Sequence, residues 1–164
     1  MQKVTAVCPG SFDPVTYGHI DIFKRASLLF DKVIALVVIN KAKSGTFTVE
    51  ERVEMIRSVT ADLPNVEVDC YGGLLVDYVR DKGAGAIVKG LRAVTDFEYE
   101  FQMALINKKM YPHADTVFLT TNAENMYLSS SVVKEIAAVG GNIGNFVPPQ
   151  IHDDIKARLS KNIS

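Results

Sequence analysis

The sequence predicts an α/β protein with a doubly wound, five-stranded parallel sheet. Short β-rich runs alternate with helical stretches along the chain, which is the pattern of strands joined by helical crossovers. The run 33–39 is apolar at every position, as expected of a central parallel strand covered on both faces. Polar, glycine-flanked clusters follow several runs, at the edge where such sheets bind ligands.

The strands are predicted from apolar or alternating runs that end at turn residues. The first run stops at Pro9-Gly10, and the third alternates polar and apolar residues, which predicts one wetter face. The predicted strands cover residues 4–8, 33–39, 66–70, 86–88 and 116–119.

Helices are predicted where apolar residues recur at helical spacing between start and stop signals. Thr48 and Glu51 form a capping-box pattern, and Thr95 and Glu98 repeat it. Gly140-Gly141 ends another helix. The predicted helices cover residues 19–30, 48–60, 74–81, 95–109 and 132–139, and a last one follows Pro148-Pro149 into the region of Lys161.

Composition narrows the class of protein. The chain has 164 residues, 48% of them hydrophobic and 23% charged, so we expect a single domain spanning residues 1–164. No apolar run approaches the ~20 residues that cross a bilayer, and the first residues lack a signal-peptide pattern, so we expect a cytoplasmic location. The formal net charge of −1 gives no bulk attraction to nucleic acid or membranes, and neither partner is expected. Cys8 and Cys70 lie in strand-like runs, which predicts buried thiols.

The first polar cluster, residues 9–19, follows the first predicted strand and leads into a helix. Gly10 lets the backbone turn close to a ligand, and Ser11 offers a hydroxyl group. Gly18 and His19 open the helix, whose free N–H groups and dipole attract phosphate. A helix cap with a satisfied histidine explains this cluster equally well when it is taken alone.

Three further clusters fall at the same edge of the predicted sheet. Residues 89–92 place two cations beside a glycine, residues 129–131 place three serines at a helix start, and Lys43 lies in a loop after the second strand. Each cluster has an ordinary explanation when it is taken alone. Residues 89–92 can be a solvated turn, residues 129–131 a redundant N-cap, and Lys43 a surface lysine. Their convergence favours a phosphate site. The chain has neither a Walker A loop nor a G-x-G-x-x-G fingerprint, and no Cys/His array with metal-ligand spacing, so no dedicated metal site is expected.

Four segments, taken in order, resemble the bacterial phosphopantetheine adenylyltransferase family. The Thr-x-Gly-His part of the first marks a wider nucleotidyltransferase superfamily, whereas the third is more specific. The resemblance implies a Rossmann-like nucleotidyltransferase fold and transfer of AMP from ATP to 4'-phosphopantetheine, which gives dephospho-coenzyme A and pyrophosphate. The segments are PGSFDPVTYGH (9–19), FTVEER (47–52), KGLRAVTDFEYE (89–100) and SSSVVKE (129–135).

The resemblance implies a role for each matching residue. His19 matches a transition-state stabiliser at the α-phosphate of ATP, Ser11 a hydroxyl residue that contacts the transferring phosphates, and Lys43 a lysine that holds the phosphopantetheine phosphate; these are the catalytic candidates. Lys89 stands where many members have arginine, so the charge is kept and the fork geometry is lost. Phosphopantetheine is expected to contact Ser11, Lys43, Leu75 and Lys89. ATP is expected to contact Ser11, Phe12, His19, Gly90, Leu91, Arg92, Glu100, Asn125, Met126, Tyr127, Leu128, Ser129, Ser130 and Ser131.

The implied reaction demands positioning and charge rather than covalent chemistry. The attacking phosphate oxygen is already anionic at neutral pH, so no general base is required. Mg²⁺ is expected to arrive with ATP. The resemblance also implies a homohexamer and feedback inhibition by coenzyme A. Three alternatives stay open: a related enzyme such as a nicotinate-nucleotide or cytidylyl-transferase, a non-catalytic adenine-nucleotide sensor, and a purely structural module.

Overall fold

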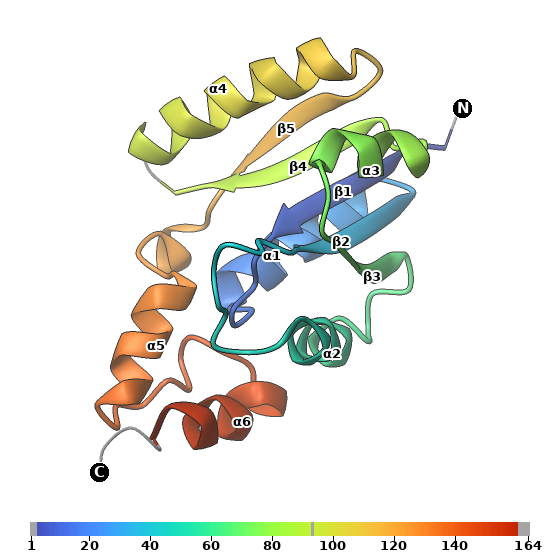
Figure 1. Cartoon of the computed structure of the whole chain (residues 1–164). Coiled ribbons are helices and arrows are strands. Elements are labelled where there is room, and N and C mark those ends of the chain that lie inside the picture. Colours follow the sequence, from blue (N-terminus) through green and yellow to red (C-terminus); the bar gives the residue numbers. More distant parts are fainter. Residues whose placement is uncertain (1–2, 93, 161–164) are drawn as a thin grey trace.

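The protein is built on one parallel sheet with strand order β3-β2-β1-β4-β5 (Figure 1). The computed structural model describes residues 3–92 and 94–160. The order reverses direction after β1, which makes the sheet doubly wound and confirms the predicted fold class. The strands are β1 (Thr5–Gly10), β2 (Lys32–Val38), β3 (Val66–Tyr71), β4 (Ala86–Leu91) and β5 (Asp115–Thr120).

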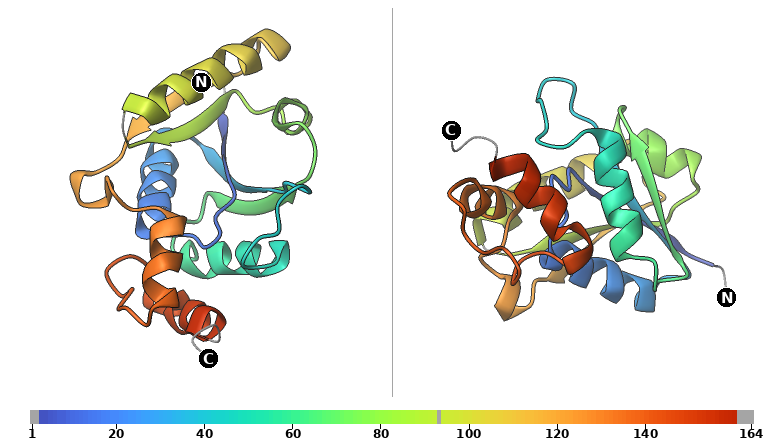
Figure 2. Two further views of the ribbon diagram at one scale, coloured as in Figure 1. Left: turned by 60° about the vertical axis from the view of Figure 1, so that its left-hand side comes forward. Right: turned by 90° about the horizontal axis from the view of Figure 1, so that it is seen from below.

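Helices cover both faces of the sheet. The views in Figure 2 place α1 and α2 on one face and α3 and α4 on the other, with α5 and α6 beyond the carboxyl ends of the strands. None of the helices in the described ranges is long and apolar enough to cross a bilayer. The helices are α1 (Tyr17–Leu29), α2 (Val49–Val59), α3 (Leu75–Asp81), α4 (Val94–Met110), the short 3₁₀ helix η1 (Ala123–Asn125), α5 (Ser130–Ala138) and α6 (Pro149–Leu159).

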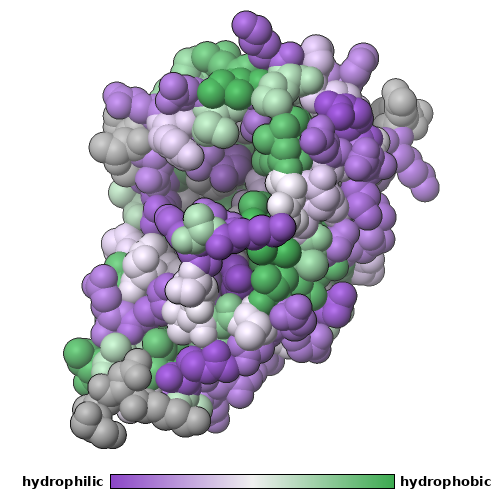
Figure 3. Space-filling model, in the orientation of Figure 1, coloured by the Kyte–Doolittle hydropathy of each residue, from purple (hydrophilic) through white to green (hydrophobic). Residues whose placement is uncertain are grey.

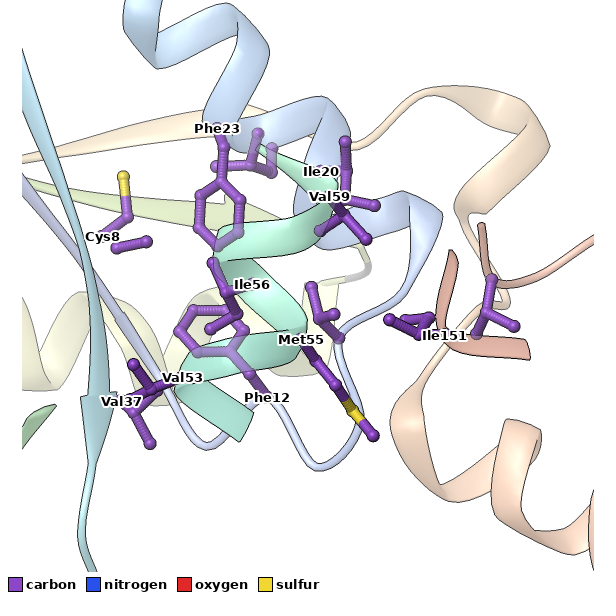
Figure 4. Close-up of a cluster of buried hydrophobic side chains, with 14 of the residues drawn as sticks. Cys8, Phe12, Ile20, Phe23, Val37, Val53, Met55, Ile56, Val59 and Ile151 are labelled. Carbon is purple, nitrogen blue, oxygen red and sulfur yellow. The ribbon is translucent and has the colours of Figure 1, made fainter. Parts of the chain in front are cut away.

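The apolar run of β2 is explained by the two hydrophobic clusters that it joins. Val33, Ala35 and Val37 pack into the larger cluster, on the side of α1 and α2 (Figure 4). Ile34 and Leu36 point to the opposite face and join the cluster below α3. Each fully buried Val, Leu or Ile contributes about 1.5–3 kcal/mol relative to its exposed state. The alternation therefore explains why β2 is an interior strand, between β3 and β1, with both faces covered.

The sheet opens between β1 and β4. Only two residue pairs join these strands, Ala6 with Ala86 and Val7 with Ile87, whereas the pairing of β1 with β2 continues to Gly10. The carboxyl-terminal halves of β1 and β4 therefore separate at the point where the strand order reverses. Sheets of this kind bind ligands at that position.

The predicted capping box at Thr48 is confirmed. The backbone N–H of Thr48 donates to the carboxylate of Glu51 at 2.8 Å, and the N–H of Glu51 donates to the Thr48 hydroxyl oxygen at 3.2 Å. Both bonds satisfy donors that the first turn of α2 would otherwise leave free.

Three local predictions are wrong. β4 does not end at residue 88, because Lys89 and Leu91 continue the ladder with β5. The second capping box does not start α4, because that helix begins at Val94 and already includes Thr95. Cys70 is exposed rather than buried, although it shares a face of the strand with Val66 and Val68, which pack against the larger cluster; it is the next-to-last residue of the edge strand β3.

Candidate active site

A cavity of about 330 Å³ occupies the gap between the ends of β1 and β4. Its walls come from these strand ends, the start of α1, the first turns of α4 and the segment that leads into α5. In the space-filling view the surface is hollowed below α4, and hydrophilic side chains gather around the hollow (Figure 3). The cavity therefore lies at the edge where the sequence places its polar clusters.

The cavity brings together most of the residues predicted to bind ATP. They come from segments that lie far apart along the chain. Those that line it are Ser11, Phe12, His19, Gly90, Arg92, Glu100, Asn125, Leu128, Ser129 and Ser130. Lys89, which is predicted to contact phosphopantetheine, lines it as well.

Six predicted site residues lie outside the lining of this cavity. Lys43 is exposed in the loop after β2, and Leu75 packs against the hydrophobic cluster below α3. Tyr127 is 69% exposed and borders a separate shallow depression beside α1. The remaining three are Leu91, at the end of β4, Met126 and Ser131.

The imidazole of His19 has a defined tautomer. His19 is the third residue of α1, and its Nδ1 accepts a hydrogen bond from the backbone N–H of Thr16 at 3.0 Å. A backbone N–H can only donate, so Nδ1 carries no proton, and the proton of the neutral ring lies on Nε2. Burial, followed by the positive charge of Arg92, lowers the pKa of His19 from 6.5 to about 4. His19 is therefore a neutral N–H donor at physiological pH.

This lowered pKa makes the stability of the fold sensitive to acid. Between pH 4 and 6.5 the unfolded chain binds a proton at His19 that the folded chain does not bind. The free energy of unfolding therefore falls as the pH drops through this window, and the contribution of His19 is complete above it. We expect urea midpoints to show a smaller loss between pH 7 and pH 4.5 in His19→Gln than in the wild type. An equal loss in both would contradict the assignment.

Two cations of the cavity are each paired with a carboxylate of α4. The guanidinium of Arg92 lies 3.1 Å from Asp96 and also donates to the carbonyl oxygen of Leu128 at 3.3 Å. The ammonium group of Lys89 lies 3.3 Å from Glu100. These pairs hold two positive charges at the cavity in the absence of an anion. Phosphate oxygens entering the cavity would share or displace the carboxylates.

Phe12 connects the imidazole of His19 to the larger hydrophobic cluster. The residue is 4% exposed, and its ring forms a T-shaped pair with the imidazole of His19, with centroids 5.0 Å apart. The ring of Phe23 lies 5.3 Å away on another side. A Cβ atom at Gly10 would come within 2.8 Å of the Phe12 ring, so glycine is needed there to make room for it. Gly10 also lines the cavity, as expected of backbone near a ligand, and the buried ring is a second reason for glycine at this position.

The serines before α5 are partly engaged within the protein. Ser129 caps the helix, because its hydroxyl oxygen accepts from the N–H of Val132 at 3.2 Å. The hydroxyl of Ser130 donates to the carbonyl oxygen of Pro14 at 2.7 Å. The helix-cap interpretation is thus correct for Ser129. Its hydroxyl proton can still donate to a ligand, and the N-terminus of α5 faces the same cavity as that of α1.

The cavity also contains residues that were not among the predicted site residues. Asp96 holds Arg92, as described above, and Thr121 follows directly after β5. The rule that ligands meet residues just after parallel strands could have found Thr121. Cys8 lines the cavity as well, but burial raises the pKa of its thiol to about 12, so it is not a thiolate nucleophile at neutral pH.

Similar proteins share both the fold and the sequence pattern of this chain. A family model described as cytidylyltransferase-like matches residues 7–136. A phosphopantetheine adenylyltransferase of Caldanaerobacter subterraneus subsp. tengcongensis is 55% identical over 157 residues, which cover 96% of this chain and 98% of the relative. A phosphopantetheine adenylyltransferase of Clostridium botulinum is 54% identical over 156 residues, which cover 95% of each chain.

Two solved structures agree with the fold. A putative nicotinate-nucleotide adenylyltransferase from Vibrio parahaemolyticus has a TM-score of 0.71 at 17% identity, covering 94% of this chain and 91% of that one. The nicotinic acid mononucleotide adenylyltransferase of Plasmodium falciparum has a TM-score of 0.68 at 13% identity, covering 98% and 96%. At these identities they show the fold alone.

The fold, the cavity at the reversal of strand order and the matching family model define a nucleotidyltransferase of the cytidylyltransferase-like class. Within that class, the chain belongs to the phosphopantetheine adenylyltransferase family. The resemblance seen in its four sequence segments is thereby confirmed.

Proposed function

We propose that the protein transfers AMP from ATP to 4'-phosphopantetheine, giving dephospho-coenzyme A and pyrophosphate. Family membership supports this reaction. The observation that carries it at the site is the convergence of neutral His19 with the cations Lys89 and Arg92 in one cavity between two helix N-termini. An adenylyl transfer needs these parts, because two polyanions must meet and extra negative charge develops on the α-phosphate.

In the proposed step, a phosphate oxygen of phosphopantetheine attacks the α-phosphorus of ATP. The new P–O bond forms in line with the bond to the β-phosphate, which breaks, and pyrophosphate leaves with its electron pair. The Nε2–H of His19 donates to a non-bridging α-phosphate oxygen as charge builds there. Arg92 and Lys89 attract the phosphate groups, and Ser11 offers its hydroxyl at the same wall of the cavity. No group on the protein has to gain or lose a proton.

Lys43 takes the second substrate in this proposal. Its loop leaves the carboxyl end of β2, the neighbour of β1, and therefore borders the same edge of the sheet as the cavity. An exposed lysine on a long stem can reach a phosphate that enters beside ATP. We propose that phosphopantetheine approaches between this loop and the cavity, with Leu75 on the pantetheine side.

The direct test is incubation with ATP, Mg²⁺ and phosphopantetheine, followed by mass detection of dephospho-coenzyme A. A parallel reaction with nicotinate mononucleotide tests the related enzyme class to which the structural neighbours belong. A third reaction with ATP alone measures release of pyrophosphate. Product in the first reaction only is the expected result. Product from nicotinate mononucleotide alone, or none in any reaction, would overturn the proposal.

We also propose that Mg²⁺ enters bound to ATP. In the cavity the carboxylates Asp96 and Glu100 face Arg92 and Lys89 in ion pairs. The cation would therefore take its oxygens from phosphate groups and water, as Mg²⁺ commonly does in such enzymes. Bound there, it would neutralise phosphate charge.

We further propose that the protein self-associates. The family resemblance implies a homohexamer. The exposed side of α4 carries an unusual number of large apolar side chains, and hydrophobic residues gather over this helix in Figure 3. Sedimentation velocity is expected to show an oligomer, and a monomer at micromolar concentration would contradict this. Inhibition by coenzyme A and a cytoplasmic location stay predictions from the sequence. The apolar residues of α4 are Phe97, Tyr99, Phe101, Leu105, Ile106 and Met110.

A further inference from the structure

Asp13 is a buried carboxylate that lies outside the lining of the cavity. The residue is 8% exposed and lies in the segment between β1 and α1. Oδ2 accepts the backbone N–H of Thr46 at 2.8 Å, and Oδ1 accepts the N–H of Phe47 at 2.9 Å. The ammonium group of Lys134, on α5, lies 3.6 Å from Oδ2. Both oxygens therefore hold the end of a loop that begins after β2.

A second buried side chain joins the same two segments. Arg52, on α2, donates from Nη1 to the carbonyl oxygen of Ser11 at 3.0 Å and from Nε to the carbonyl oxygen of Thr48 at 3.3 Å. The segment 11–13 is thus tied to the segment 46–48 from both sides. Hydrogen bonds with an ionised partner are roughly twice as strong as neutral ones. Such a junction resists relative movement of the two segments.

The junction holds the parts that the two substrates would contact. Segment 11–13 carries Ser11 and leads to His19, whereas Lys43 lies in the loop 40–47 and only three residues before Thr46. Three residues of chain span at most about 11 Å. Residues 40–45 are exposed, so little else packs against this loop near its tip.

We propose that Asp13 is a positioning residue that sets the place of Lys43 relative to the phosphate site at Ser11 and His19. This inference rests on the proposed function, in which Lys43 holds the second substrate. Asp13 touches neither substrate and acts through the loop. A buried carboxylate is costly unless it is hydrogen-bonded or paired. Lys134 lies beside Asp13, and both hydrogen bonds of the carboxylate are directed at the Lys43 loop rather than at the core.

The test is a double-mutant cycle in the full-length protein. Asp13→Asn keeps the shape of the side chain but turns one acceptor into a donor that opposes a backbone N–H. We expect it to lower kcat/KM for phosphopantetheine by about 10–100-fold, the scale of a small misplacement of a catalytic group. The affinity for ATP is expected to stay within about twofold. In a Lys43→Ala background, Asp13→Asn should have almost no further effect.

Different outcomes separate this inference from the function on which it rests. Full activity in Lys43→Ala would remove the role proposed for Lys43. Impaired activity in Lys43→Ala, with the same loss again when Asp13→Asn is added, would leave that role intact and overturn the positioning role of Asp13. An equal fall in ATP affinity would overturn it as well.

Gly45→Ala is a second variant that tests the proposal if Asp13→Asn does not fold. It disturbs the junction from the exposed loop 40–45. A Cβ atom at Gly45 would lie 2.9 Å from the carbonyl oxygen of Phe47 and 3.4 Å from Oδ2 of Asp13. We expect a loss of activity that again disappears in the Lys43→Ala background, with faster hydrogen exchange at the N–H groups of Thr46 and Phe47. Ser44→Ala, in the same loop, is the matched control and should retain wild-type values. Unchanged turnover and exchange in Gly45→Ala would overturn the proposal.

Discussion

Replacing His19 with alanine is expected to lower kcat by about 10²–10³-fold, because a donor that acts mainly in the transition state is worth about 3–4 kcal/mol. The ring is neutral and its Nε2–H is free, since Nδ1 is occupied by the N–H of Thr16. A neutral donor binds the ground-state triphosphate only modestly. The dissociation constant for ATP should therefore change little, and steady-state kinetics with calorimetric titration of ATP will measure both quantities.

A pair of conservative variants sharpens this test. The amide nitrogen of Gln at position 19 can lie near the position of Nε2, whereas the shorter Asn side chain matches Nδ1. We expect His19→Gln to retain more activity than His19→Asn, and both to bind ATP. Near-normal turnover in His19→Ala would show that the transition state does not use this imidazole.

Replacing Phe12 with alanine is expected to destabilise the fold by about 3–5 kcal/mol, as is typical of removing a large ring from a packed core. The ring lies among Phe23, Val37 and Ile56 in the larger hydrophobic cluster (Figure 4). The backbone of Phe12 has φ of 47°, a conformation that costs a non-glycine residue roughly 1–2 kcal/mol. Alanine would keep that strain and lose the burial that offsets it.

Urea denaturation of Phe12→Ala measures the loss. Leu28→Ala is a suitable control, because Leu28 is 84% exposed and its truncation should change stability by no more than about 0.5 kcal/mol. The variant should also lose activity under folded conditions, since the Phe12 ring packs against the imidazole of His19. A loss of stability equal to that of Leu28→Ala would contradict the packing described for this ring.

The sheet and most of the cavity could be predicted from local patterns. The apolar run of β2 predicts burial on both faces because each residue faces one helix layer or the other. The start of α2 follows from Thr48 and Glu51 alone, since a capping box needs no distant partner. Three of the four polar clusters meet in the cavity because parallel strands bring their carboxyl ends to one edge, whereas Lys43 lies outside its lining.

What the sequence could not show depends on partners far along the chain. β4 extends beyond residue 88 because β5 pairs with Lys89, and no local pattern marks this pairing. No role is predicted for Asp13, because the N–H groups that it binds lie 33 and 34 residues away along the chain. Gly10 lines the cavity as expected, but no local pattern shows that the Phe12 ring also requires glycine there. These roles arise from tertiary packing.

A crystal structure of the protein with a non-hydrolysable ATP analogue, methylene-bridged between the α- and β-phosphates, tests the central claim most directly. We predict the triphosphate in the gap between β1 and β4, with an α-phosphate oxygen about 2.7–3.2 Å from Nε2 of His19. Arg92 should contact the triphosphate. A triphosphate bound outside this gap, or one whose α-phosphate is out of reach of His19, would contradict the account.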